Sequence, residues 1–585
     1  MLWLVFLLFV KVIGAFPTEQ FFSTSEYAAS LELRPIKLGK INFLHTTDTH
    51  GWLGSHLLQR DFNADWGDFI SFVELFRKNR INSKNQDLIV LDTGDKRDGN
   101  GLSDATSLVG MNSSVIFNEM DFDLLTLGNH ELYTEEASIL EYYGTALSGK
   151  FKDKYVSSNV EFIDDKGSKH AFGNKYLCFE TTNTKTKILA LSFIFDFRRY
   201  NRKTIVTPAI QEIKKPWFFD MVKSYTEDDI DMVLVFGHIP ARGEADDELL
   251  SIHKELRKYY PNIVIQYFGG HTHIRDFKIM DDKSTCLQSG KFSETVGFLS
   301  IDNLDSQNVT FSRRYLDFSK RSFKFHAGVK SLTTTLGDSV SKAISKLRTH
   351  LGLNEIIGYV PHTFYMSARP LNSSENIYNL LSTKVLPLLE TPKGSFSHSR
   401  IIMINSGSVR YDLYKGPFTK DTEYIVMPFP NFWKYIRLPL KVAIQIEPAL
   451  NNGPVIAHLV PPEGRVGSKL VASSQKCPFV TNPKLSEGFT TVDDAGCDGD
   501  DTPHRSQYYH DIPNVVQCIQ VHDEEPDTIV DFIYYSFMED SVITAINFIL
   551  GQLEGEDHKN VTRGDTLHYG GRATKELLKA YIKSI

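Results

Sequence analysis

The segments LHTTDTHGWL at 44–53 and FGGHTHIRDF at 268–277 each place histidine and aspartate directly after a short apolar run. Three further segments repeat the arrangement: LDTGDKRDGNGLSD at 91–104, LLTLGNHEL at 124–132 and FGHIPARG at 236–243. Short β-branched runs of this kind, alternating with helical stretches, predict buried strands of an α/β fold. The polar residues then lie at the carboxyl ends of the strands, the edge at which open α/β sheets bind ligands.

The residue types at this edge are typical of a metal site. Those with ligand chemistry are Asp48, His50, Asp95, Asn129, His130, His238, His271 and His273. Carboxylate oxygens together with imidazole nitrogens favour zinc, manganese, cobalt or iron over magnesium or calcium. One carboxylate can bridge two cations, and such a pair can bind a phosphoryl group and generate hydroxide near neutral pH. The ordered set therefore predicts two divalent metal ions, although each short motif alone is weak.

These segments resemble the calcineurin-like metallophosphoesterase superfamily, and the chain as a whole is similar to the two-domain 5'-nucleotidase family, including its secreted and vacuolar fungal members. The resemblance implies an α/β fold: a metallophosphoesterase β-sandwich flanked by helices, in four layers (α/β/β/α), plus a C-terminal α/β substrate domain joined by a helix. It also implies that a metal-bridging hydroxide attacks phosphorus.

The resemblance further implies a role for each ligand. One metal ion is held by Asp48, His50, Asp95 and His273, and the other by Asp95, Asn129, His238 and His271. Asp95 bridges the two ions. His130 stays off the metals and stabilises the phosphoryl transition state or the leaving oxygen.

One position departs from the family pattern. Nucleotidases carry an aspartate three residues after the catalytic histidine, whereas this chain has Tyr133 there. A histidine without its carboxylate partner has a lower pKa and is less firmly oriented. We therefore expect the change to affect the rate and the substrate, but not the metal ions.

The second half of the chain resembles the substrate domain of the family. Arg410, in INSGSVRYDLYKG at 404–416, matches the arginine that binds a substrate anion, and Phe429, in MPFPN, matches a base-stacking aromatic. Tyr534 is the nearest match to the second aromatic, although Glu539 and Asp540 stand where the family has part of a Gly-Gly-Asp turn. The alternatives are a surface ion pair for Arg410 and core packing for Phe429.

The pattern along the chain predicts its division into domains. The expected divisions are a signal peptide at 1–15, a lead-in at 16–38, the metallophosphoesterase domain at 39–328, a linker helix at 329–352, a 5'-nucleotidase-like domain at 353–550 with a loop-rich insert at 452–515, and a polar tail at 551–585. Rotation about the linker helix would then close the two domains around a substrate.

The N-terminal sequence and the sequons place the protein on the secretory route. The apolar run that begins the chain is short for a membrane anchor, and its small residues predict cleavage near Ala15. N-glycosylation sequons occur at Asn112, Asn308, Asn372 and Asn560. We expect a secreted protein or one of the vacuolar or lysosomal lumen, with no transmembrane segment after cleavage.

The net charge of −8 gives no support to binding of a nucleic-acid polymer. The expected partner is a small phosphoester, and a nucleotide in the first place; the oligomeric state is open. The leading interpretation is a two-metal hydrolase of phosphate monoesters. The alternatives are a phosphodiesterase acting on cyclic nucleotides or nucleotide sugars, and a lumenal metal- or nucleotide-binding protein with little catalysis.

Overall fold

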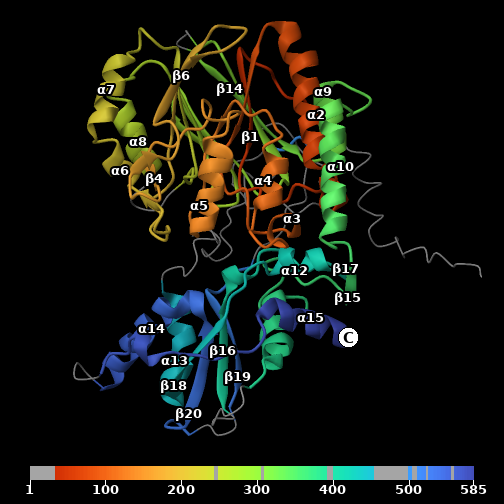
Figure 1. The fold of residues 1–585 in the computed structure, drawn as a ribbon, viewed down its shortest axis with the longest axis vertical. Helices are drawn as coiled ribbons and strands as arrows, with labels where there is room; N and C mark the ends of the chain where they lie inside the picture. The colour runs from red at the N-terminus through yellow and green to blue at the C-terminus, as the bar shows by residue number, and fades with distance from the viewer. Residues whose placement is uncertain are drawn as a thin grey trace, which may run out of the picture.

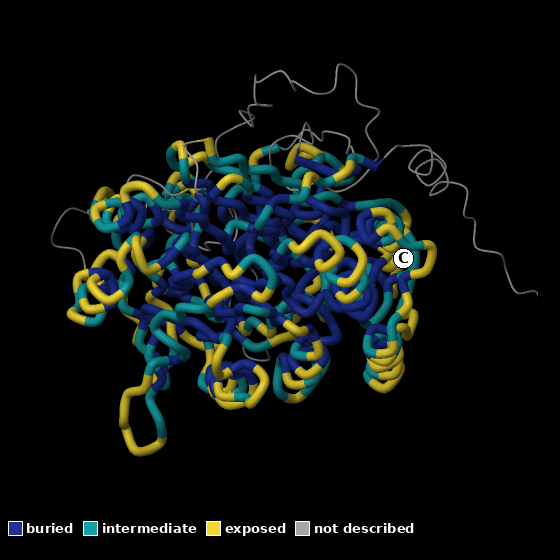
Figure 2. The backbone as a smooth tube through the Cα atoms, turned by 90° about the horizontal axis from the view of Figure 1, so that it is seen from above, coloured by how far each residue is buried: buried dark blue, intermediate teal, exposed yellow. Residues whose placement is uncertain are grey.

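The computed structural model describes residues 33–242, 248–304, 308–391, 399–453, 499–502, 510–521, 525–554 and 559–585. The predicted signal peptide and most of the lead-in and insert lie outside these ranges. The described chain forms two α/β units, one above the other in Figure 1. Figure 2 shows the buried residues concentrated inside, with exposed residues on the outer turns and helices.

Two mixed sheets form the centre of the first unit. The first sheet has the order β14-β13-β1-β2-β3, with bounds Thr310–Asp317, Thr295–Asp302, Ile41–Thr46, Asp87–Asp92 and Leu124–Leu125. The second has the order β11-β12-β10-β9-β7-β6, with bounds Arg275–Asp281, Ser284–Ser289, Val264–Gly269, Met232–Phe236, Lys187–Ser192 and Tyr176–Glu180. The five strands expected from the apolar runs are β1, β2, β3, β9 and β10, divided between these two sheets.

Helices cover both outer faces, which gives the expected four layers (Figure 1). One outer layer contains α6 (Ala209–Glu212), α7 (Pro216–Ser224) and α8 (Glu248–Leu256), and the other contains α2 (Trp66–Phe76), α9 (Lys320–Ala327) and α10 (Thr335–His350). Shorter helices and a small sheet complete the unit: α3 (Gly101–Asp104), α4 (Met111–Phe117), α5 (Glu135–Glu141), β4 (Val160–Ile163), β5 (Lys169–Ala171) and β8 (Thr204–Val206). The apolar residues facing between the sheets, such as Phe43 and Phe268, form a separate buried cluster.

The expected linker helix is α10, and it packs along α2 of the first unit. A Cβ atom at Gly67 would lie 2.2 Å from the carbonyl oxygen of Gly337, so only glycine allows the two helices to approach this closely. Ser341 Oγ also donates to Asp65 Oδ1 at 2.7 Å. Helix α10 is therefore part of the first unit's surface, and the domain boundaries at 329 and 353 stay predictions.

The second unit has one main sheet in the order β19-β16-β20-β18-β21, with bounds Val515–Gln520, Arg400–Asn405, Ile529–Tyr535, Trp433–Pro439 and Leu567–His568. A two-stranded sheet pairs β15 (Ile356–Val360) with β17 (Gly416–Thr419). The helices are α11 (Ile377–Leu380), α12 (Lys420–Val426), α13 (Leu440–Asn452), α14 (Glu539–Glu554) and α15 (Thr574–Ser584). No helix among the described residues is long and apolar enough to cross a membrane.

Polar and apolar contacts join the two units. Asp421 of α12 accepts from the backbone N–H of Gly101 at 3.0 Å and pairs with Arg348 of α10 at 2.7 Å. Beside them, Trp52 and Phe292 of the first unit form a small buried cluster with Tyr411 of the second. These contacts hold the loop that carries Arg410 against the carboxyl edge of the first unit's sheets.

Candidate dinuclear metal centre and substrate cleft

The predicted metal ligands converge at the carboxyl ends of strands from both sheets. Asp48, His50 and His273 form one group whose ligand atoms lie within 4.8 Å of one another, and Asp95, His238 and His271 form another. The two groups adjoin, because Nε2 of His50 lies 3.8 Å from Oδ2 of Asp95 and 3.1 Å from Nε2 of His273. Nε2 of His238 lies 3.0 Å from the same Asp95 oxygen, so this carboxylate stands between the groups.

The backbone at the centre is strained. Five of the seven predicted ligands are non-glycine residues with positive φ: Asp48 (49°), His50 (47°), Asp95 (56°), His271 (78°) and His273 (64°). Each such residue costs about 1–3 kcal/mol and persists only where its surroundings over-determine it. The concentration of strain at one sheet edge is typical of a functional site rather than of ordinary loops.

Neighbouring groups orient the ligands. Nδ1 of His50 lies 2.8 Å from the carbonyl oxygen of Arg97, and Nδ1 of His238 lies 2.9 Å from that of Thr93. In both rings these bonds turn Nε2 into the centre, as in metal-binding histidines. Asn129 donates from Nδ2 to the Tyr133 hydroxyl at 3.2 Å, which turns its Oδ1 inward. Tyr133 therefore contributes to the orientation of a predicted ligand.

Several inward atoms are buried and have no hydrogen-bond partner. Counting partners within the described residues only, they are Oδ1 of Asp48, Oδ1 of Asn129 and Nε2 of His130. A buried polar atom without a partner is costly, and three at one point, two of them oxygen acceptors, indicate a ligand that supplies positive charge. Mixed oxygen and nitrogen donors fit a pair of transition-metal cations.

The electrostatics of the centre favour a bound cation. Burial, followed by neighbouring positive charge, lowers the pKa of His50, His271 and His273 well below its usual range, so these imidazoles are neutral. Burial also lowers the pKa of His238, but the carboxylates of Asp95 and Asp48 outweigh it and raise the value to about 10. The carboxylates thus create a strong demand for positive charge in the centre.

His130 has a carboxylate partner, contrary to the expectation drawn from Tyr133. Its Nδ1 lies 2.9 Å from Oδ2 of Asp98, which belongs to the loop after β2 rather than to the histidine's own loop. Burial raises the pKa of Asp98, but the hydrogen bond with His130 and the charge of Arg97 outweigh it and lower the value. The expectation of an unpartnered histidine was therefore wrong, because a residue 32 positions away supplies the carboxylate.

Glu131 ties together the two loops that carry Asp95 and His130. Its carboxylate accepts from the backbone N–H groups of Gly128 at 2.8 Å, Asp95 at 3.0 Å and Lys96 at 3.1 Å. Burial and the charge of Asp95 raise the pKa of Glu131 to about 6. Its role is to fix the loop backbone, since all three bonds are to main-chain donors.

The second unit brings Arg410 to this edge. Arg410 is buried, and its Nε and Nη2 have no hydrogen-bond partner in the part of the chain that the structure describes. Burial lowers the pKa of Arg410, while Tyr133, Asp95 and Asp98 act in the opposite direction across the unit boundary. The guanidinium carbon lies 5.3 Å from the ring centre of Phe429, which is half-buried. Arg410 forms no ion pair with another described residue, and Phe429 is only partly buried, so their substrate-binding roles stay predictions.

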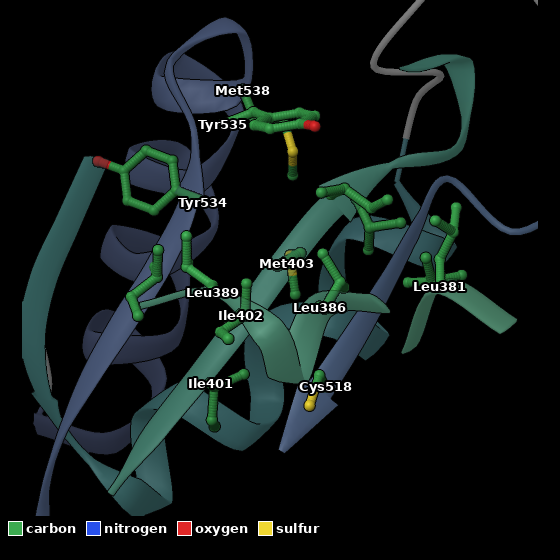
Figure 3. Packing of buried hydrophobic residues seen from close by; sticks show 14 of the residues in the cluster. Leu381, Leu386, Leu389, Ile401, Ile402, Met403, Cys518, Tyr534, Tyr535 and Met538 are labelled. Atoms are coloured by element: carbon green, nitrogen blue, oxygen red, sulfur yellow. The ribbon is translucent and has the colours of Figure 1, made fainter. Parts of the chain in front are cut away.

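Tyr534 does not reach the cleft. Its side chain is fully buried in the core of the second unit, among the residues drawn in Figure 3. The exposed aromatic nearby is Phe537, in the short turn Ser536–Met538 after β20, with the guanidinium carbon of Arg199 at 4.6 Å from its ring centre. The sequence did contain a signal for Phe537, because it stands two residues before Glu539-Asp540. It lies three residues after Tyr534, the residue that we assigned.

The sequons lie at surface positions. Asn308, Asn372 and Asn560 are exposed, whereas Asn112 is half-buried near the start of α4. Their modification stays a prediction.

Comparison with known families agrees with this architecture. Residues 41–275 match the calcineurin-like phosphoesterase family, and residues 363–543 match the C-terminal domain of NAD nucleotidase. A solved structure of a 5'-nucleotidase from Candida albicans is 40% identical, with a TM-score of 0.84, and the similarity covers 95% of this chain and 100% of that one.

Two curated relatives extend over nearly the whole chain. An uncharacterized protein of Saccharomyces cerevisiae is 55% identical over 98% of this chain and 97% of its own length. A secreted protein of Arthroderma benhamiae is 33% identical over 89% of this chain and 88% of its own.

Proposed function

The chain belongs to the 5'-nucleotidase family of calcineurin-like phosphoesterases, and on that premise we propose that it hydrolyses phosphate monoesters, with nucleoside 5'-monophosphates as substrates. One observation carries the proposal. Buried side-chain atoms that can bind metal converge where the sheet strands end, on residues with positive φ, and a buried arginine of the second unit faces them. Metal ions can supply the nucleophile and neutralise charge in such a reaction, and a guanidinium can bind the phosphate.

The residues present fit two divalent cations of zinc, manganese, cobalt or iron. Asp48, His50, Asp95 and His273 would hold one, and Asp95, Asn129, His238 and His271 the other. When bound, such a pair supplies a hydroxide nucleophile near neutral pH and neutralises charge on the phosphoryl group. The second-sphere bonds of His50 and His238 fix the ring orientations that this requires.

His130 serves as the proton donor or electrostatic stabiliser at the phosphoryl group. Asp98 fixes its Nδ1, and its Nε2 points into the centre, 3.9 Å from Oδ2 of Asp95, without a partner of its own. An imidazole aimed in this way can donate to a phosphoryl oxygen or to the leaving oxygen as negative charge develops.

Arg410 binds a phosphoryl oxygen, and the aromatic rings bind the leaving group. A buried guanidinium with two unpartnered nitrogens matches the two oxygens of a phosphate. Phe429 lies under this guanidinium, and Phe537 is exposed and contacts Arg199 of the first unit. We assign Phe537, rather than Tyr534, to the second stacking position for a nucleobase.

A second candidate is cleavage of a phosphodiester or pyrophosphate in a dinucleotide or nucleotide sugar. The match of residues 363–543 to the C-terminal domain of NAD nucleotidase favours it. Both candidates use the same metal centre and differ in the group that leaves phosphorus.

The deciding experiment compares AMP, NAD, p-nitrophenyl phosphate and bis-p-nitrophenyl phosphate. The purified protein is stripped with a chelator, reloaded with manganese, cobalt or zinc, and assayed beside Asp95→Asn. We expect metal-dependent release of phosphate from AMP and a loss of at least about 10³-fold in the variant, since the bridging carboxylate positions both cations. Preference for NAD or the diester would select the second candidate. Two bound ions without turnover would indicate a binding protein.

The proposed location is the secretory route, with release from the cell or delivery to the vacuolar lumen. The secreted relative and the exposed sequons at Asn308, Asn372 and Asn560 support it. Endoglycosidase digestion of protein from culture medium and from vacuoles, followed by mass spectrometry, tests both the sites and the compartment.

A further inference from the structure

A short segment between α13 and β19 of the second unit contacts the first unit. The chain leaves the second unit after α13 and returns to it before β19 at the same point, where Val515 N donates to Asn451 Oδ1 at 2.9 Å. Between these points, residues 499–502 lie against the first unit's sheet. We call these four residues, Gly-Asp-Asp-Thr, the strap.

The strap pairs with the edge strand β14. Tyr315 N donates to Gly499 O at 2.6 Å, and Asp501 N donates to Tyr315 O at 2.9 Å, which makes a parallel β-bridge. On its other side, Arg34 N donates to Asp501 O at 2.8 Å. The strap thus adds a short strand between the lead-in and β14, and main-chain bonds hold it on both sides.

Two buried carboxylates anchor the strap. Asp500 forms an ion pair with Arg275, and both side chains are almost entirely buried. Asp501 accepts from Ser322 Oγ at 2.5 Å and lies 3.0 Å from Nε2 of His326, on α9. A carboxylate is rarely buried without a specific partner, so these contacts define the position of the strap.

Arg275 connects the strap to the metal centre. It begins β11, two residues after His273, and pairs in register with Ser289. Its guanidinium lies 5.5 Å from the ring centre of Tyr315, the strand residue that the strap joins. A Cβ atom at Gly290 would lie 3.0 Å from Cγ of Arg275, so a glycine makes room for the arginine's stem.

The loop before Arg275 needs such an anchor. Its two predicted ligands, His271 and His273, have positive φ, a backbone conformation that residues other than glycine rarely adopt. The first half of the loop is held where His271 N donates to Asp48 Oδ2 at 3.1 Å. The second half is held at Ile274, whose carbonyl oxygen accepts from Gly290 N and from Gln288 Nε2, both at 3.1 Å. The next residue, Arg275, is fixed by the ion pair with Asp500.

We propose that Asp500 of the strap is a positioning residue for the metal centre: through Arg275 it holds the loop that presents His271 and His273. The proposal rests on the proposed function, because these histidines must be metal ligands. It means that the second unit supplies a support for the metal-binding edge besides Arg410. The metal affinity of the first unit then depends on an insert that lies beyond the linker helix in sequence.

The test measures metal binding rather than turnover. Full-length protein is stripped with a chelator and titrated with Co²⁺ by calorimetry, and the visible absorption of the bound cobalt is recorded. The variants are Asp500→Asn and Asp501→Asn. The second is the matched control, since it removes an equally buried strap carboxylate whose partners lie on or next to α9.

We expect Asp500→Asn to weaken binding of at least one ion about tenfold or more and to change the cobalt spectrum, as losses of outer ligand supports do. Asp501→Asn should lower the melting temperature but leave both affinities and the spectrum unchanged. Unchanged affinities in Asp500→Asn, or equal weakening in both variants, would overturn the proposal.

If Asp500→Asn does not accumulate as folded protein, Arg275→Lys decides the question. It keeps the positive charge but loses the planar guanidinium fork, so we expect a smaller fall in affinity and a changed spectrum. Wild-type affinities in this variant would overturn the proposal. Failure of the proposed function would look different, because the unaltered protein itself would bind fewer than two ions.

Discussion

The metal edge of the first unit and the facing loops of the second hold their functional residues in different ways. At the metal edge each predicted ligand follows a buried strand within a few residues, and five of the seven have positive φ. In the second unit, Arg410 lies beyond the turn Ser406–Ser408 after β16 and reaches the site only because the units are docked. Metal ligands are thus fixed by strand ends, whereas substrate contacts are fixed by packing between units.

This difference has a physical origin. Metal coordination requires donors within fractions of an ångström, which short, strained loops on strand ends provide. A leaving group is larger and varies between substrates, and loops at a unit interface can contact it without that precision. We therefore expect changes at the metal edge to affect kcat and changes in the facing loops to affect KM.

The sharpest test of the metal edge is Asp98→Asn. The variant keeps the shape but removes the charge that orients His130, so we expect kcat to fall about 10- to 100-fold with little change in KM. Steady-state kinetics on AMP with the metal-loaded enzyme measures both. The comparison variant is Tyr133→Phe, which keeps the edge-to-face ring contact with His130 and removes the hydroxyl that orients Asn129, so it reports on a metal ligand rather than on the orientation of His130. Equal kcat in Asp98→Asn and the wild type would exclude this role for Asp98.

The facing loops are tested by a pair of aromatic substitutions. We expect Phe537→Ala to raise the KM for AMP about tenfold, since stacking of a base on an aromatic ring contributes about 1–3 kcal/mol. Tyr534→Phe should leave KM unchanged, because that ring is buried and its hydroxyl lies by Thr566. A larger effect from Tyr534→Phe than from Phe537→Ala would return the stacking role to Tyr534.

The smallest expected effect is on the free energy of unfolding, and it comes from Asp412, two residues after Arg410. Burial raises the pKa of Asp412 from 3.8 to about 6, although its hydrogen bond from Met366 N acts in the opposite direction. The folded state then binds more protons than the unfolded chain between these two values, so stability falls as pH rises through that window and stays lower above it.

Asp412→Asn removes this penalty. We expect it to stabilise the protein on the order of 1–3 kcal/mol at pH 8 and to have little effect at pH 4. Thermal unfolding at the two pH values measures the difference. Asp229→Asn is the control of opposite sign, because hydrogen bonds from Thr226 lower the pKa of this exposed carboxylate. A loss of stability at pH 8 in Asp412→Asn would contradict the prediction.

The sequence by itself determined an α/β fold, five strands of the first unit's two sheets and the set of metal-ligand candidates, and the family resemblance implied the four layers. Asp48, His50, Asp95, Asn129, His238, His271 and His273 were identifiable because each follows a buried run at short range, and the strand then carries it to the shared edge. Helix α10 was likewise predictable from the local sequence pattern. Its close packing against α2 was not.

Only the tertiary structure decided the contacts between distant segments. It gave His130 a carboxylate from Asp98, buried Tyr534 and exposed Phe537, and joined Asp500 to Arg275, 225 residues away. Local spacing cannot encode such pairs, because they depend on how loops of different strands and units pack after the sheets form. Such polar pairs become strong only where burial lowers the local dielectric and each partner replaces the water that the other has lost, and this happens only once the whole fold has excluded water.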